Sequence, residues 1–499
     1  MLKDIIKKEI LAHLLDAKFL FTFMICTALI LLSVHVGMRN HTSDKKEYAA
    51  GVAEAQRGLD EQLANSVYVR DGQRTPNITA LMGAFTSNAV RIYRQPMALG
   101  TIVRGVQDAS GRVSRVTNRT ENRPAESKYE SNLFSSIFST FDLLFVVKMV
   151  LSLFALLFAY DAVSGEKERG TLSLALANSV PRSRLILGKA IGGYFSLILP
   201  LLIPLFLGAA LMSLNSDLAL GGEDWLRIFL LYGMFLLYLS VFFALGLFVS
   251  ALTVRSSSSF LTLLFVWTVL VLIVPKVAAT AAGWIRPAPF AHEVMSQKTR
   301  VIPQIWEEID TDSLRRLSTS RPAQPTTMEG RKDPAYIAAT RKYSEEYNRL
   351  SLELGQKYET LANEAYMKID SDYLVRQEAQ QRLVKNLSRV SPASGLTLGG
   401  MVLARTGEEE YNRFLDATRS YRAVYNDWLV RNNLRNEVLR GFALSPPILG
   451  IADMPQFQFE PESLRQSLMR TLPDFALMAA MTILLLTGAF FAFLRYDVR

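Results

Sequence analysis

A short charged block between two long apolar runs contains the side chains best suited to chemistry. The block begins at Asp161 and ends at Lys189, and its carboxylates come before its arginines. The simplest interpretation is a solvated loop. The functional alternative is a surface that holds a partner protein by charge pairing. The residues that we expect to make such a contact are Asp161, Glu166, Glu168, Gly170, Thr171, Arg182 and Arg184.

The same block contains part of the spacing of a phosphate-binding loop, Gly165-x-x-x-x-Gly170-Thr171. The lysine that must follow the second glycine is missing, and no strand is predicted before the loop. No other Gly-x-x-x-x-Gly-Lys-Ser/Thr pattern occurs in the sequence. We therefore reject a nucleotide site in this chain. If the protein uses ATP, another subunit must bind it.

The other reactive residue types do not favour an enzyme or a metalloprotein. The histidines, His13, His35, His41 and His292, are scattered without the spacing of metal ligands. The single cysteine, Cys26, lies inside the first apolar run, so no disulfide can form within the chain. We find no nucleophile with a partner base at a usable spacing. We expect no catalytic residue, no metal site and no cofactor.

The elements that must position the charged block are membrane spans. Half of the 499 residues are hydrophobic and the mean hydropathy is +0.17, but the apolar residues are concentrated in six runs. Each run has about twenty residues, enough to cross a bilayer as a helix. The sequence therefore predicts an all-α integral membrane protein. The expected spans are 18–36, 140–160, 191–213, 226–252, 259–282 and 472–494.

The distribution of basic residues predicts how these spans are oriented. Lysines and arginines are frequent before the first span, between spans two and three, and in the tail, whereas the loop 214–225 has three acids and no base. The positive-inside rule then places both termini in the cytoplasm. Because much of the net charge of +9 lies beside spans, it does not indicate a nucleic-acid partner.

This topology places two large insertions outside the membrane. The second is mostly helical, because apolar residues recur every three or four positions from Tyr343 to Tyr373, and again from Tyr411 to Trp428. We expect these two tyrosine-rich helices to pack on each other, with a ligand groove as the alternative. The expected regions are 1–36, 37–135, 136–282 with its charged segment 161–190, 283–471 and 472–499.

Lys148 is the exceptional residue inside a span, in the sequence Phe145-Val-Val-Lys148-Met-Val-Leu. An ammonium group in hydrocarbon costs at least about 2.5–3.5 kcal/mol on insertion scales. This intramembrane polar residue could face protein, water or a dimer interface. It could instead extend toward the outer headgroups, because Asp142 indicates that the membrane boundary is near. The sequence leaves both alternatives open.

The order of residues in the charged block resembles the cytoplasmic signature of a known family. Asp161-x-x-Ser-x-Glu-x-Glu-x-Gly-Thr-Leu, followed by Arg-x-Arg and Leu-Gly-Lys, is similar to the signature of type-2 ABC transporter permeases. The similar group is the multicopper-enzyme-maturation-like permeases, which carry large extracytoplasmic insertions. Further matches are Ser391-Pro-Ala-Ser394, Arg405-Thr-Gly407 and the ending Phe493–Arg499.

The resemblance implies a function that composition and spacing do not show. It implies a six-span half that pairs with a second half, alike or paralogous, in a bacterial inner membrane. A separate cytoplasmic ATPase would hold ATP and Mg²⁺ and dock on the charged block. The chain would then be the permease of an ATP-driven exporter, surrounded by membrane lipids. The alternative is a mechanotransmission protein whose outer helical domain acts on an extracytoplasmic protein partner without transport.

Overall fold

The structure is a computed structural model of the 499-residue chain. Parts of the predicted first insertion, 77–89 and 117–135, and the tail residues 497–499 lie outside the residues that it describes. The described residues are 2–15, 17–65, 67–70, 73–76, 90–116, 141–177, 181–309, 311–431 and 454–496.

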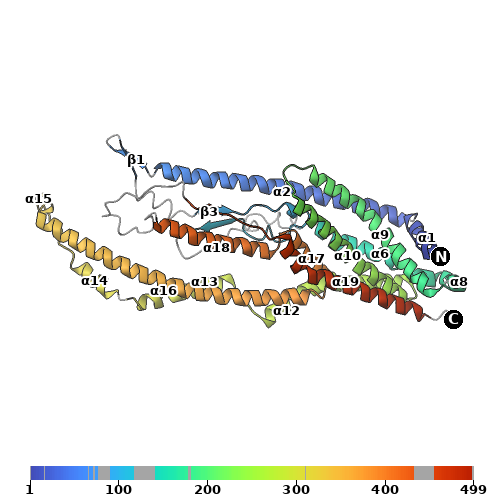
Figure 1. The fold of residues 1–499 in the computed structure, drawn as a ribbon. Helices are drawn as coiled ribbons and strands as arrows, with labels where there is room; N and C mark the ends of the chain where they lie inside the picture. Colours follow the sequence, from blue (N-terminus) through green and yellow to red (C-terminus); the bar gives the residue numbers. More distant parts are fainter. Residues whose placement is uncertain are drawn as a thin grey trace.

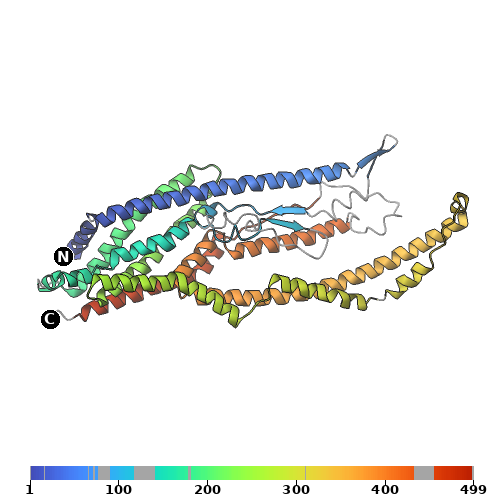
Figure 2. The same ribbon diagram turned by 180° about the vertical axis from the view of Figure 1, so that it is seen from behind.

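The molecule is elongated, with a bundle of helices at one end and long helical arms at the other (Figures 1 and 2). Both chain ends lie at the bundle end, near α1 (Leu2–Leu14) and α8 (Thr171–Ala177). The short helix α15 (Met328–Arg331) lies at the opposite end. We call the end with the chain termini the inner side, and the end with the two insertions the outer side.

Six helical segments of the described chain are long and apolar enough to cross a membrane, which confirms the predicted fold class. Two of these spans contain a stretch of π-helix, labelled η. In chain order the spans are α2 (Ala17–Asn65); α5 (Leu143–Phe145), η4 (Val146–Leu151) and α6 (Ser152–Ala159); α9 (Arg182–Ser213); α10 (Gly222–Leu252); α11 (Ser256–Thr268), η5 (Val269–Ile273) and α12 (Val274–Ile285); and α19 (Leu464–Leu494).

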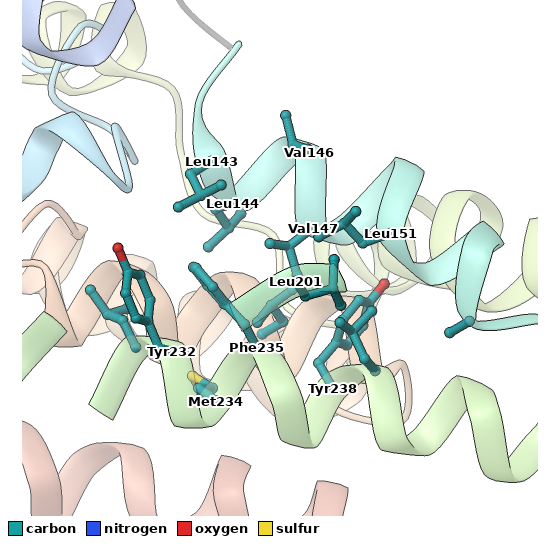
Figure 3. Close-up of a cluster of buried hydrophobic side chains, with 14 of the residues drawn as sticks. Leu143, Leu144, Val146, Val147, Leu151, Leu201, Tyr232, Met234, Phe235 and Tyr238 are labelled. Atoms are coloured by element: carbon teal, nitrogen blue, oxygen red, sulfur yellow. The ribbon is translucent and has the colours of Figure 1, made fainter. Parts of the chain in front are cut away.

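α10 is the central helix of the bundle and packs against α6, α9 and α19. Tyr232, Phe235 and Tyr238 follow one side of α10 and lie opposite Leu144 and Val147 of the second span (Figure 3). Lipid tails are as apolar as these side chains. Close packing and interhelical hydrogen bonds therefore hold the spans together more than hydrophobic burial does.

The helix that contains the first span continues beyond residue 36, the predicted end of that span, and runs without a break to Asn65 on the outer side. Gly37 allows the 3-10 helix η2 (Ala98–Thr101) to approach α2, since a Cβ atom there would lie 2.2 Å from the main-chain oxygen of Thr101. Farther out, Asp44 forms ion pairs with Arg104 (3.0 Å) and Arg112 (2.7 Å). These contacts fix the first insertion to α2.

The described part of the first insertion also contains four short strands, which were not predicted from the sequence. β1 (Val67–Arg70) pairs with β2 (Gln73–Pro76), and β3 (Val90–Tyr93) pairs with β4 (Val113–Val116). Both pairs are antiparallel, and in the second pair Val90 lies opposite Val116. Strands of four residues give too little alternation to be recognised in a sequence.

The second insertion begins with a long hairpin. α13 (Ala291–Glu307) and α14 (Asp312–Thr319) run outward, and α16 (Pro334–Ser388) returns beside them (Figure 1). With 55 residues, α16 has a length of about 80 Å at 1.5 Å per residue. The Tyr358 ring stacks on Trp306, with 4.7 Å between ring centroids. The first tyrosine stripe therefore packs on α13.

The second tyrosine stripe has a different partner. α17 (Pro392–Leu403) follows α16 and leads to α18 (Glu408–Arg431). On α18, Tyr421 and Tyr425 pack in one cluster with Ile92 of β3 and Val116 of β4. The expectation that the two stripes pack on each other is therefore wrong. The reason is that α13 already covers the stripe of α16, so α18 buries its own stripe against the first insertion.

Candidate functional site

Two short helices form the charged block at the inner side of the bundle. α7 (Ser164–Glu168) follows the second span directly, and α8 comes after Arg169 and Gly170. Gly170 has φ = +73°, a conformation that glycine adopts readily and that permits the turn between the two helices. The hydroxyl of Thr171 donates a hydrogen bond of 3.4 Å to the main-chain oxygen of Glu166.

Glu166 points into the protein and not toward a partner. Its Oε1 lies 2.7 Å from Nζ of Lys189, whose side chain is only 4% exposed, and the same Nζ lies 3.1 Å from Oε1 of Glu9. α1 approaches α9 closely because Gly188 and Gly192 face it. One buried ammonium therefore joins α7, α9 and α1 through two carboxylates.

Glu168 contacts the beginning of the fifth span. Its Oε2 accepts hydrogen bonds from the backbone N–H (3.0 Å) and the hydroxyl (2.8 Å) of Ser256, the first residue of α11. A carboxylate in this position satisfies a free N–H group and interacts favourably with the helix dipole. Glu168 is nevertheless exposed, so a partner can reach it from the inner side.

Arg182 binds the end of the sixth span. Its Nη1 donates hydrogen bonds of 2.9 Å to the main-chain oxygens of Leu494 and Tyr496. Carbonyl groups at the end of a helix have no partner within the helix, so a guanidinium group satisfies them well. Lys167 lies over the ring of Tyr496, with Nζ 4.5 Å from the centroid. The charged block thus contacts the ends of spans five and six.

The exposed part of the block combines charge with one large apolar side chain. Glu168, Thr171 and Arg184 are exposed, and Leu174 on α8 is 67% exposed. Leu172, two residues earlier, is buried in a cluster with the ends of the spans. Exposed charged and apolar side chains on one short segment can contribute to a protein interface.

The structure therefore divides the predicted residues into two groups. Glu168, Gly170, Thr171 and Arg184 are exposed on the inner side. Glu166 and Arg182 hold the block to other helices, and the main-chain oxygen of Asp161 accepts a hydrogen bond from the N–H of Gly165. The roles of Lys189 and Glu9 were not predicted from the sequence. The Gly188-x-x-x-Gly192 spacing was the available signal that another helix approaches there.

Lys148 lies in the π-helical stretch η4 of the second span. Its main-chain oxygen accepts hydrogen bonds from the hydroxyls of Ser152 (2.6 Å) and Tyr238 (2.9 Å). The indole N–H of Trp267, in the fifth span, donates to Ser152 Oγ at 2.8 Å. The Lys148 side chain is half-buried and forms no hydrogen bond or ion pair with a described residue. The main-chain oxygen of Lys148, and not its side chain, thus takes part in the polar contact between spans two, four and five.

A second group of charges joins the spans to the insertions on the outer side. The side chain of Arg227, six residues into α10, is fully buried. It donates to Glu223 Oε1 (2.8 Å), to Ser467 Oγ (3.0 Å), and to the main-chain oxygens of Leu403 (3.0 Å) and Glu462 (2.7 Å). One arginine therefore holds α10, α17 and α19 together. The role of Arg227 was not predicted from the sequence.

The helix α17 is fixed at both ends. At its beginning, the hydroxyl of Ser391 donates a hydrogen bond of 2.5 Å to the main-chain oxygen of Leu270 in the π-helix η5. Just after its end, Arg405 forms an ion pair of 2.5 Å with Asp224 of α10, and has φ = +57°. The two motifs that contain Ser391 and Arg405 thus mark the ends of one buried helix.

Two neighbouring carboxyl groups at the beginning of α18 differ in their environment. Burial favours the neutral form of Glu409, but its ion pair with Lys385 outweighs burial and lowers its pKa. Burial raises the pKa of Glu410, although its carboxylate accepts a hydrogen bond from the N–H of Glu462. At the same helix end, the ionised form is therefore stabilised at Glu409 and destabilised at Glu410.

Within the described ranges, no group of three or more histidine, cysteine, aspartate or glutamate residues is arranged to hold a metal ion. The carboxylates in the ion pairs above have arginine or lysine side chains as their partners. What the arrangement can do is mechanical: the inner block joins the ends of several spans, and the outer group joins spans to insertions.

Comparisons with known proteins agree with this arrangement. The model of the family described as "ABC-2 family transporter protein" matches residues 4–498. Among curated proteins, the chain is similar to the "Probable ABC transporter permease protein NosY" of Stutzerimonas stutzeri, with 34% identity over 125 residues. The aligned region covers 24% of this chain and 44% of that relative, so it spans less than half of the relative's length.

Proposed function

This chain belongs to the ABC-2 family of transporters, and from this premise we propose that it is the permease subunit of an ATP-driven exporter. A separate cytoplasmic ATPase subunit would bind ATP and Mg²⁺ and would dock on α7 and α8. The observation that carries the proposal is the pair of hydrogen bonds that Ser256 donates to Glu168, because they connect an exposed carboxylate directly to the beginning of a span.

The geometry of the inner block supports a way to pass movement from the ATPase to the membrane. A force on α7 would reach the fifth span through Glu168, and would reach α9 and α1 through the ammonium of Lys189. Movement of α9 would reach the end of the sixth span through Arg182. Several spans would therefore respond together. This proposal also places the inner side, and both chain termini, in the cytoplasm of a bacterial cell with an inner membrane.

We propose further that two six-span permease halves, alike or paralogous, form the complete transporter. The half-buried ammonium of Lys148 would then face either the interface between the halves or a polar path. The network of Ser152, Tyr238 and Trp267 supports this role, because its bonds meet at the main chain of a π-helical stretch, and such stretches are frequent at functional sites.

A second candidate function is mechanotransmission without transport. The observation that favours it is the series of contacts from the spans to the outer hairpin. α17 is held to α10 by Arg227 and Arg405, and it follows α16, which extends for about 80 Å, after a short break at residues 389–391. In this case the tip of the hairpin would act on an extracytoplasmic protein partner, and no substrate would cross the membrane.

The coupling role is tested by the double substitution Glu166→Lys and Glu168→Lys. We expect the variant to insert in the membrane but to lose stimulation of the ATPase by at least about tenfold. The reason is that Glu166→Lys places a second cation beside Lys189, and Glu168→Lys places a positive charge at the positive end of α11. The measurement is ATP hydrolysis by the ATPase co-reconstituted with the permease in liposomes.

The matched control is Glu345→Lys with Glu346→Lys, which makes the same charge change on the exposed surface of α16. This control should retain full stimulation. If the variant at Glu166 and Glu168 binds the ATPase and supports full activity, the docking role is refuted. The single substitution Glu168→Lys separates the exposed carboxylate from the buried one, because it leaves the ion pair of Glu166 with Lys189 intact.

A further inference from the structure

An open pocket of about 470 Å³ lies on the outer side, between α2 and the loop that follows α9. This loop approaches α2 closely, because Asp217 accepts a hydrogen bond of 3.0 Å from the hydroxyl of Thr42. Neither the charged block nor the group of contacts around Arg227 includes residues of the pocket. The residues that line it are His35, Met38, Arg39, Thr42, Ser43, Lys46 and Asn215.

The basic residues of the pocket lie on one face of α2. His35, Arg39 and Lys46 are spaced by four and seven positions, so their side chains leave the helix on the same side. All three are exposed, and none forms a hydrogen bond or ion pair with a described residue. In contrast, Lys45, the neighbour of Lys46, donates to the main-chain oxygen of Asp217 at 2.8 Å. The basic groups in the pocket are therefore available to a ligand.

The polar groups around these side chains suit a phosphate ester. The guanidinium of Arg39 can bind two phosphate oxygens at once, and Lys46 can add a point charge. Ser43 and Asn215 line the pocket with a hydroxyl and an amide that can donate further hydrogen bonds. A carboxylate, that of Asp217, also lies at the pocket. It accepts a hydrogen bond from the hydroxyl of Thr42.

An apolar surface continues from the pocket toward the middle of the membrane. Leu32 lies one turn before His35 on the same face of α2 and is exposed. On α9, Leu207 and Leu211 are exposed, and Leu214 is 83% exposed beside Asn215. Spans one and three are in direct contact here, since a Cβ atom at Gly208 would lie 3.2 Å from Val34. Hydrocarbon chains can therefore lie along this surface directly below the basic residues.

We propose that this pocket binds the phosphate headgroup of an anionic phospholipid from the outer leaflet, with its acyl chains on the surface formed by α2 and α9. A soluble phosphate would use the same basic groups. The adjacent exposed leucines favour the lipid, because a soluble anion would leave this apolar surface without a role. The bound lipid would fix the distance between α2 and the loop after α9, where the first insertion begins.

The experiment compares the full-length protein with Arg39→Gln and with the matched control Arg57→Gln, which removes an exposed arginine farther along the same helix. Each protein is delipidated in detergent and titrated with phosphatidylglycerol, and the bound lipid is counted by native mass spectrometry. We expect the apparent affinity to fall about tenfold in Arg39→Gln, since a lost charge-assisted contact has this order of effect. Arg57→Gln should bind like the unchanged protein.

Two further ligands distinguish the source of the phosphate. Diacylglycerol has the chains without the phosphate, and glycerol 1-phosphate has the phosphate without the chains. We expect both to bind at least about tenfold more weakly than phosphatidylglycerol. Equal binding of diacylglycerol, or equal binding of phosphatidylglycerol to Arg39→Gln and the unchanged protein, would overturn the proposal. Tight binding of glycerol 1-phosphate would overturn its lipid part. Because Lys46 is exposed, Lys46→Gln provides a second variant if Arg39→Gln does not fold.

Discussion

The inner and outer sides of the bundle each place a basic side chain where several helices meet, but the two groups differ in their surroundings. On the inner side, Lys189 lies between Glu9 and Glu166, which are both partly exposed to solvent. On the outer side, Arg227 is fully buried and donates to two main-chain oxygens besides its carboxylate partner, Glu223. The carboxylates on both sides can reach water, since Glu223 is 47% exposed, but the two main-chain oxygens that Arg227 holds are buried.

This difference indicates different roles for the two sides. Removing one partner of a buried ionic contact costs about 3–5 kcal/mol, because the remaining polar groups lose both water and partner. The outer group therefore acts as a fixed joint between the spans and α17. The inner group can break and form again at lower cost, as a segment that passes on the movement of a partner must do.

The largest effect is expected for Arg227→Met, which keeps an apolar stem but removes all of the hydrogen-bond donors. The main-chain oxygens of Leu403 and Glu462 would remain buried without the partner that they have now. We expect the free energy of unfolding to fall by about 3–5 kcal/mol. The measurement is an SDS titration of the purified protein in mixed micelles, followed by tryptophan fluorescence.

Arg341→Met is the matched control, because Arg341 is exposed on α16 and its ion pair with Glu345 is long, at 4.0 Å. It should change the free energy of unfolding by less than about 0.5 kcal/mol. A loss below about 1 kcal/mol for Arg227→Met would contradict the idea of a fixed outer joint, because the freed carbonyl groups would then have other partners.

A smaller loss of stability, but a larger loss of coupling, is expected for Lys189→Met. Glu9 and Glu166 are partly exposed, so water can replace the ammonium, and the free energy of unfolding should fall by about 1–3 kcal/mol. Stimulation of the partner ATPase should fall by about tenfold or more, because α7 would no longer be held to α9 and α1. Both quantities are measured on the same reconstituted sample.

Lys189→Arg serves as the control, since it keeps a positive charge between the two carboxylates. It should recover most of the coupling even though the larger side chain fits less well. If Lys189→Met retains full stimulation of the ATPase, Lys189 contributes only to stability, and the proposed contrast between the two sides is lost.

Much of the fold could be predicted from the sequence, because the bilayer imposes a strong constraint. A span needs about twenty consecutive apolar residues, and this pattern is visible without any knowledge of packing. The four strands of the first insertion were missed because each has four residues. The packing of the tyrosine stripes was also predicted wrongly. Periodicity shows which face of a helix is buried, but does not show which of several neighbours covers it.

The location of the charged block could be predicted, but the direction of its side chains could not. Glu166 and Glu168 are two residues apart and look equivalent in the sequence. In the folded chain, Glu166 turns toward Lys189 and Glu168 toward Ser256. Arg227 was missed because it lies near the end of a span, where a single arginine is common and usually reaches the headgroups. Only the folded chain shows that the last residue of α17, Leu403, lies within reach of this guanidinium.

The smallest expected effect comes from two neighbouring residues at the outer joint, and its sign depends on pH. Burial raises the pKa of Glu410, so the folded state holds this proton more tightly than the unfolded state does. The resulting stabilisation is present below the ordinary pKa of 4.5 and is lost as the pH rises through the folded pKa. Glu410→Gln should therefore raise the melting temperature at pH 7.5 by up to about 2 °C, with no gain at pH 4.

Glu409 is the matched control for this last prediction, because Lys385 lowers its pKa despite burial. Its stabilisation is present above the ordinary pKa and is lost as the pH falls through the folded pKa. Glu409→Gln should therefore lower the melting temperature at pH 7.5 and have no effect at the acid end of the series. Thermal unfolding in detergent between pH 4 and pH 8 measures both variants. Shifts of the same sign at pH 7.5 would show that the two carboxyl groups share one environment. The outer joint would then distinguish between neighbouring charged groups no better than the inner block does.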